Sequence, residues 1–365
     1  MRLSKQKKVN VMVNINVIYF LFVILIFLGK LVRFTIMKAV LVDTAIAHAL
    51  LPLILDSNGK FTFFEVETIV NEGGNTVVIY RVLNVLKLDT IMEFEWAVTI
   101  VFNLVILFIL MRIKEQLTLT QVTFIALSII VLNIFDFTLA KEPIQMFYFI
   151  LIYFVLVAKF IPDKMKYVLC IAIILFSAAA FRTYYVLIAF FTVCAQIICE
   201  ITIIRKDKVT IKSILVLVFT IGFIYFIFLN VCKVASTDNY DNLIRVRTRV
   251  SSARSDMRNI LPTTNLVLFC LDYMIMLFRM IAPVELLPLG IKYLPYVLYQ
   301  FIMTYFVVDS MIRIRENSYQ KNITLFIYLG YLFGSATFEP DFGSWVRHEA
   351  VLFPLYLILS DSTKD

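Results

Sequence analysis

Apolar runs of about twenty residues recur along the whole chain, separated by short polar stretches. A helix of that length crosses about 30 Å of hydrocarbon, and a helix satisfies its own backbone hydrogen bonds inside lipid. The sequence lacks the alternating pattern of a membrane barrel. It therefore predicts an all-α polytopic integral membrane protein, a single transmembrane domain over 1–365. About ten spans are expected, at 11–29, 94–111, 118–138, 146–161, 167–181, 185–204, 213–231, 293–311, 322–338 and 349–360.

Two further apolar segments contain charged residues and are predicted not to cross the membrane. In 39–55 an aspartate would lie at mid-bilayer, which costs several kcal/mol. We therefore expect a helix on the membrane surface, within a mixed outer segment at 30–90. The segment 264–290 contains three charged residues and two prolines, so we expect a re-entrant or interfacial element on the outer face.

Composition supports a membrane protein, and the distribution of charge predicts which side of the membrane each loop faces. Apolar residues make up 61% of the chain and the mean hydropathy is +0.89, whereas soluble domains contain roughly 45–50% apolar residues. The net charge of +8 is interpreted through the tendency of lysine and arginine to gather in cytoplasmic loops, not as nucleic-acid binding. With 264–290 outside, four short basic loops lie on the side of the basic N-terminal tail. Both termini are then cytoplasmic, and the first span is an uncleaved anchor.

On this topology the outer face carries as many basic residues as the cytoplasmic face, which is more than orientation requires. A guanidinium group grips phosphate oxygens through a bidentate fork, so the expected partner is a lipid-linked diphosphate. The alternative is that these arginines lie among lipid headgroups. The candidates are spread over the loop 232–263, the segment 264–290 and two short turns: Arg245, Arg247, Arg249, Arg254, Arg258, Arg279, Arg182 and Arg347.

The stretch EPDFGSWVRHEAVLFP, residues 339–354, interrupts two apolar runs with the densest group of polar residues. Candidate general bases for a sugar hydroxyl are Glu339, Asp341, Glu349 and His348. The alternative is that Glu339 and Asp341 cap a helix end or pair with Arg347. Trp345 is a headgroup anchor or a sugar platform.

Other polar residues are predicted near the same face. Lys141 and Glu142, in the turn AKEPIQ, form a charge pair near the site or a simple interfacial pair. Asp136 lies near the outer end of the third span, where an intramembrane acid is expected to be functional.

Several motifs are missing from the sequence. It contains no Walker A sequence, no HExxH, no Cys/His cluster and no Asp-x-Asp pair. We therefore expect no cofactor and no metal, and arginines would have to neutralise a leaving diphosphate. The five cysteines lack metal or disulfide spacing and are interpreted as small buried hydrophobic residues.

The order of these features resembles a known family. AKEP, FRTYY, an arginine-rich outer loop, LFRMIAPVELLP and the closing EPDFGSWVRHEAVLFP together resemble the Wzy-type and EpsG-like polymerases of bacterial capsule, exopolysaccharide and O-antigen repeat units. The resemblance extends over about residues 75–360. It rests on order, spacing and loop character.

The resemblance implies a metal-independent glycosyltransferase on the outer face of the bacterial plasma membrane. It would transfer a growing glycan from undecaprenyl diphosphate to the next lipid-linked repeat, beside a flippase and a chain-length regulator. The matching arginines are Arg182 and Arg347, then the cluster 245–258, then Arg279, with Lys141 nearby. An acid or His348 would deprotonate the acceptor. Sugar rings would face aromatic side chains: Tyr184, Tyr185 and Trp345.

Three other functions remain open. A flippase or transporter for the same lipid-linked sugars would need charge along a path through the bilayer, whereas the predicted spans are nearly uncharged. Another outer-face glycosyltransferase, such as an O-antigen ligase, shares the expected chemistry and differs in donor and acceptor. A structural membrane protein would leave the outer arginines unexplained.

Overall fold

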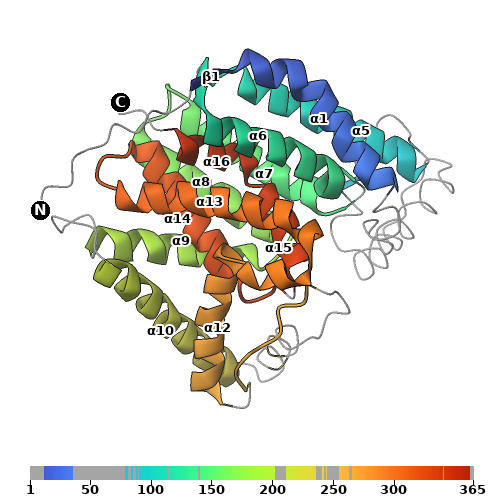
Figure 1. Cartoon of the computed structure of the whole chain (residues 1–365). Coiled ribbons are helices and arrows are strands. Elements are labelled where there is room, and N and C mark those ends of the chain that lie inside the picture. The colour runs from blue at the N-terminus through green and yellow to red at the C-terminus, as the bar shows by residue number, and fades with distance from the viewer. Residues whose placement is uncertain are drawn as a thin grey trace, which may run out of the picture.

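The computed structural model describes residues 12–35, 79–80, 84, 88, 90–113, 115–138, 140–201, 211–235, 241, 244, 255–262, 265–339 and 341–361. Helices dominate these residues (Figure 1). The named elements are β1 (Met12–Asn14), α1 (Asn16–Thr35), α5 (Ile91–Leu110), β2 (Gln116–Thr118), α6 (Leu119–Val131), the π-helix η1 (Leu132–Asp136), α7 (Glu142–Val157), α8 (Asp163–Ala180), α9 (Tyr185–Cys199), α10 (Ile211–Ala235), α12 (Leu266–Ile281), the 3-10 helices η3 (Val284–Leu289) and η4 (Ile291–Tyr293), α13 (Leu294–Ile312), α14 (Tyr319–Ser335), α15 (Phe342–Ala350) and α16 (Phe353–Ser360).

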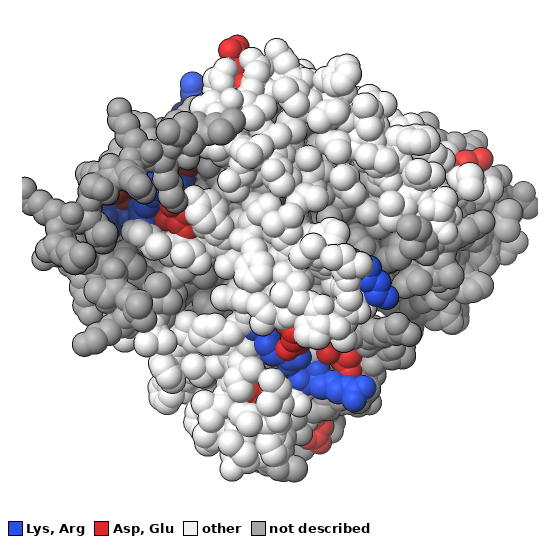
Figure 2. Space-filling model, in the orientation of Figure 1, with Lys and Arg blue, Asp and Glu red and all other residues white. Residues whose placement is uncertain are grey.

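Five helical stretches of the described residues are long and apolar enough to cross a membrane: Asn16–Thr35, Met92–Leu110, Leu119–Asp136, Leu215–Ala235 and Ile291–Ile312. Two shorter apolar helices, α7 and α9, accompany them. Each of the ten predicted spans overlaps a helix, but a count of ten spans is not confirmed. The middle of the face drawn in Figure 2 is largely uncharged, and its charged groups lie toward the ends and beside α12.

Three of the four short basic loops, those after α5, α7 and α13, come together at one end of the helical body. The fourth, at 205–212, lies largely outside the described residues. β1 pairs antiparallel with β2, which ties the start of α1 to the loop between α5 and α6. Gln121 of α6 donates to the carbonyl oxygen of Ser360 at 2.8 Å, and Lys321 of α14 donates to that of Asp361 at 2.6 Å. The start of α1 and the end of α16 therefore lie at the same end, as the predicted topology requires.

The segment 264–290 is not a further member of the bundle. α12 runs across the direction shared by α6 and α13 and packs beside α10 (Figure 1). Two 3-10 helices follow it, with Pro288 inside η3. That this element does not cross the membrane stays a prediction. The predicted surface helix at 39–55 lies outside the described residues.

Two boundaries differ from the sequence prediction, and both matter for the site. α7 begins at Glu142, four residues before the predicted span, with a proline in its first turn where no backbone N–H is needed. The predicted turn before the last span is instead the helix α15. It buries Phe342, Trp345, Val346 and Glu349, which share one face at helical spacing.

Among the described elements, α14 and α9 pack against each other most closely (Figure 1). Gly330 and Gly334 lie four apart on α14, the small-residue spacing that lets membrane helices approach each other. A Cβ atom at Gly330 would lie 2.6 Å from the backbone nitrogen of Thr192 and 2.7 Å from its Cα atom. A side chain at this position therefore requires the two helix backbones to separate.

We expect Gly330→Ala to destabilise the fold by about 1–3 kcal/mol, because the added methyl group meets backbone atoms that cannot move independently. Thermal unfolding of the purified chain in detergent measures the change. Gly222→Ala is the matched control, since its Cβ would meet only the side chain of Met274. Equal melting temperatures for both variants would contradict close packing between α9 and α14.

Candidate functional site

The candidate site is centred on Glu142, the first residue of α7. Its Oε1 atom lies 3.7 Å from Nη1 of Arg347 and 3.7 Å from Nε2 of His348. The Glu142 side chain is only 5% exposed, whereas that of Arg347 is 27% exposed. A buried carboxylate needs a compensating cation, and the last turn of α15 supplies Arg347.

His348 lies between two carboxylates. Its Nδ1 atom is 2.5 Å from Oε1 of Glu339, and its Nε2 atom faces Glu142. Because an ionised carboxylate only accepts, Nδ1 donates its proton to Glu339 and Nε2 is the nitrogen that can take up a proton. Glu339 follows α14 directly, and its backbone N–H donates to Ser335 at 2.9 Å. The predicted acid and histidine thus form one hydrogen-bonded pair.

Arg182 approaches the same carboxylate from the turn between α8 and α9. Its guanidinium carbon lies 5.6 Å from the ring centre of Phe181 and 5.7 Å from that of Tyr184. Burial lowers the pKa of Arg182, but Tyr184 and Glu142 more than offset this effect, so the pKa lies above its ordinary value. Arg182 and Arg347, predicted from turns 165 positions apart, therefore act on one acid.

Asp136 extends the group of charges into the helical body. It ends the π-helix η1, an irregularity often found at functional sites. Both carboxylate oxygens are fully buried and have no hydrogen-bond partner among the described residues, and they interact electrostatically with Glu142, Arg347 and Lys30. The ammonium group of Lys30, on α1, donates to the carbonyl oxygen of Phe137 at 2.6 Å. The intramembrane acid thus belongs to the same cluster as the predicted arginine.

A second buried ion pair lies on the two helices behind Asp136. Nη2 of Arg33 on α1 is 2.6 Å from Oε1 of Glu95 on α5, and both side chains are less than 5% exposed. Lys30 also interacts electrostatically with both residues. Sequence reasoning missed this pair because Arg33 lies just beyond the predicted first span and its partner lies 62 residues away.

Asp341 holds the start of α15 and does not face His348. Its side chain caps the helix by accepting from the N–H of Ser344 at 2.8 Å, and its backbone bridges to Asp256. Burial raises the pKa of Asp341, while the hydrogen bond from Ser344 opposes the shift. Of Glu339 and Asp341, the two acids for which the sequence allowed a capping role, Asp341 is the one that caps a helix.

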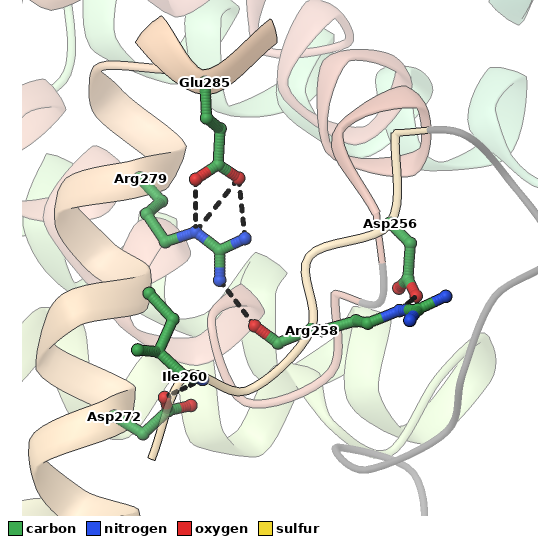
Figure 3. A network of polar contacts seen from close by, with 6 residues as sticks. All are labelled: Asp256, Arg258, Ile260, Asp272, Arg279 and Glu285. Atoms are coloured by element: carbon green, nitrogen blue, oxygen red, sulfur yellow. Dashed lines mark hydrogen bonds and ion pairs between the residues drawn. The ribbon is translucent and has the colours of Figure 1, made fainter.

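The segment 255–262 brings one loop arginine close to this helix. The N–H of Phe342 donates to Ser255 at 3.0 Å, and Arg258 pairs with Asp256 at 2.9 Å while its side chain remains 72% exposed. Arg279 is engaged differently (Figure 3): it forms a forked contact with Glu285 and donates to the carbonyl oxygen of Arg258 at 2.7 Å. Arg258 thus offers an exposed guanidinium, and Arg279 holds the segment 255–262 in place through its bond to the Arg258 carbonyl.

The remaining predicted residues divide into three groups. Trp345 and Tyr185 are fully buried, and Trp345 donates to the carbonyl oxygen of Met280 at 3.2 Å, so neither presents a surface to a sugar in this conformation. Tyr184 is half-buried beside Phe338, and Lys141 directly precedes Glu142. Four predicted arginines lie outside the described residues: Arg245, Arg247, Arg249 and Arg254.

Comparison with known proteins gives no independent assignment. No family model matches the chain, and neither a curated protein nor a solved structure matches it. The site must therefore be interpreted from its own geometry. Within the described ranges, no three His, Cys, Asp or Glu side chains are grouped so as to hold a metal ion.

Geometrically, the site combines two arginines, a histidine oriented by Glu339, and the central carboxylate Glu142. The arginines can neutralise an anion, and Nε2 of His348 can accept a proton. The partial exposure of Arg347 and His348 lets a ligand approach from this end of the molecule. Electrostatic stabilisation and proton removal are thus available within one turn of α15.

We expect Asp341→Ala to destabilise α15 by about 1 kcal/mol through the lost cap, whereas Asp341→Asn keeps the acceptor for Ser344. The raised pKa means that the carboxyl stabilises the fold below its unfolded pKa, and this contribution is lost as pH rises through the folded pKa. The asparagine variant should therefore be at least as stable as wild type at neutral pH. It should also lose the part of the acid-range pH dependence that comes from this group. Thermal unfolding between about pH 4 and 8 checks both expectations, and equal losses for both variants would exclude the capping role.

Proposed function

We propose that this protein is a membrane glycosyltransferase that polymerises lipid-linked oligosaccharide repeats. The observation that carries the proposal is the convergence of Arg182, Arg347, His348 and two glutamates at one end of an apolar helical body. These residues come from turns and helices that the sequence singles out for their polarity. The donor class that matches an arginine pair in lipid surroundings is a polyprenyl diphosphate sugar.

The proposed reaction uses each residue in a defined way. Nε2 of His348 takes the proton of the acceptor hydroxyl, whose oxygen attacks the anomeric carbon of the donor glycan. The bond between that carbon and the diphosphate oxygen breaks, and its electron pair leaves with the diphosphate. Arg347 and Arg182 neutralise the charge that develops there. Glu339 is a positioning residue, since it orients the histidine ring through Nδ1.

The resemblance noted above supplies the finer part of the proposal. The donor would be undecaprenyl diphosphate carrying a growing glycan, and the acceptor would be the next lipid-linked repeat. The site would face outward from a bacterial plasma membrane, with both chain ends in the cytoplasm. A flippase would deliver the repeats and a chain-length regulator would act on the product.

A second candidate, transport of the same lipid-linked sugars, is favoured by the buried charges on the apolar helices. Lys30, Arg33 and Glu95, which sequence analysis did not anticipate, are buried together with the predicted acid Asp136. Buried charge along a path through the bilayer is what a transporter needs. Polymerase and transporter differ in where single repeats accumulate when the protein is lost.

We expect deletion of the gene in its native host to collapse the surface polysaccharide ladder to single repeats displayed outside the cell. His348→Ala should lower the rate of chain extension by about 10²–10⁴-fold, the range of general acid–base catalysis. Arg347→Lys should also fail to restore long chains, because lysine lacks the bidentate fork. Gel analysis of the surface glycan, with membrane insertion checked for each variant, measures both.

Arg315→Lys is the matched control, because Arg315 is exposed in the loop between α13 and α14, at the end with the basic loops. It should restore the full ladder. Single repeats retained inside the cell after deletion would favour the transporter. Unchanged chain length would rule out both functions.

A further inference from the structure

The end of the protein that holds the basic loops contains a cavity of about 710 Å³. Its charged lining comes from the residues after α5, the connection between α7 and α8, the first turns of α8 and α14, and the residue after α16. The charged lining residues are Arg112, Lys159, Lys166, Lys321, Asp163 and Asp361. None of them belongs to the candidate site around Glu142.

The cavity has an excess of positive charge, with four cations against two carboxylates. Lys166 pairs with Asp163 at 3.3 Å, and its side chain is 5% exposed. Lys321 is 7% exposed and donates to the backbone carbonyl of Asp361 at 2.6 Å. Two buried ammonium groups are thus held in place by local partners at the cavity wall.

The other two cations are placed differently. Arg112 and Lys159 are exposed, and neither has a carboxylate within ion-pair distance in the described part of the chain. The guanidinium of Arg112 lies over the ring of Phe108, 4.5 Å from its centre, which holds it at the cavity mouth. An anion entering the cavity would complete the coordination of both groups.

The surroundings of the cavity are apolar and exposed, which bears on the kind of anion. Phe160 is 87% exposed beside Lys159, and Met165 and Val168 are more than half exposed around Lys166. Met111 and Phe108 extend this surface along the last turn of α5. A soluble phosphate makes no use of such a surface, whereas acyl chains cover it while the headgroup reaches the cations.

We propose that this cavity binds the phosphate headgroup of an anionic phospholipid, whose acyl chains lie on the apolar side chains at its rim. The site anchors the end of the protein that carries the basic loops in the membrane leaflet that faces it. This inference does not depend on the glycosyltransferase proposal, because its residues and its ligand are different. Basic pockets between membrane helices are recognised sites for anionic headgroups.

Titration of the detergent-purified full-length protein with phosphatidylglycerol, followed by native mass spectrometry, tests the proposal. Each cation near a membrane surface contributes about a fivefold change in affinity, so Arg112→Gln and Lys159→Gln should each weaken the first bound lipid by about fivefold. The double variant should weaken it by about thirtyfold. Both side chains are exposed, so the fold should tolerate these changes, and thermal unfolding without lipid verifies that it does.

The matched control is the double variant Lys292→Gln/Arg315→Gln, which removes the same charge from exposed positions outside the cavity. It should bind phosphatidylglycerol as wild type does. Three outcomes would overturn the proposal: equal weakening in both double variants, equal affinity for phosphatidylcholine and phosphatidylglycerol, or inorganic phosphate binding as tightly as the lipid. The last result would assign the cavity to a soluble anion instead.

Discussion

The burial of one carboxylate, that of Glu142, determines how the candidate site is built. An ionised acid that loses its water must be compensated by nearby cations or hydrogen-bond donors. Here Arg347 and Arg182 provide that compensation from two separate segments, the helix α15 and the turn before α9. Removal of Glu142 would take away the counter-charge that these two arginines share. The position of α15 against the start of α7 therefore depends on this contact.

Packing between α14 and α9 positions two other residues of the site, Glu339 and Arg182. The glycines of α14 allow its backbone to lie against α9, and both helices end at the site: α14 leads to Glu339, and α9 is entered through Arg182. The close approach of the two helices thus fixes the distance between an acid that orients His348 and an arginine that approaches Glu142. Few rotamers remain open to side chains held in this way, which favours a preorganised electrostatic environment.

Much of the architecture could be predicted from the sequence, since apolar runs of span length identify the helices directly. The grouping of the three described basic loops at one end also followed, because charge asymmetry reports on topology. The helix α15 was missed because it is short and because Glu349 interrupts the apolar face formed by Phe342, Trp345 and Val346. The capping role of Asp341 was only one of two alternatives, and a capping residue is distinguished from a catalytic one by where its side chain points.

Contacts between distant segments were beyond the reach of sequence reasoning. Glu142 was predicted to pair with Lys141, because a single sequence shows only which residues are adjacent along the chain. Its contacts with Arg347 and His348 cross about two hundred positions. The forked contact between Arg279 and Glu285 was also missed, although the two lie six residues apart. The sequence had suggested instead that the guanidinium of Arg279 binds phosphate.

The arrangement of charge along the molecule links the two proposed sites. Acids and cations at the α15 end are interleaved, so an incoming anion must compete with internal carboxylates and can be released after reaction. At the opposite cavity, two cations have no carboxylate partner among the described residues, and an anion there completes the coordination. A compensated cluster suits turnover, whereas an uncompensated one suits stable binding. The uncharged stretch of α7 between Glu142 and Lys159 keeps these two electrostatic environments apart.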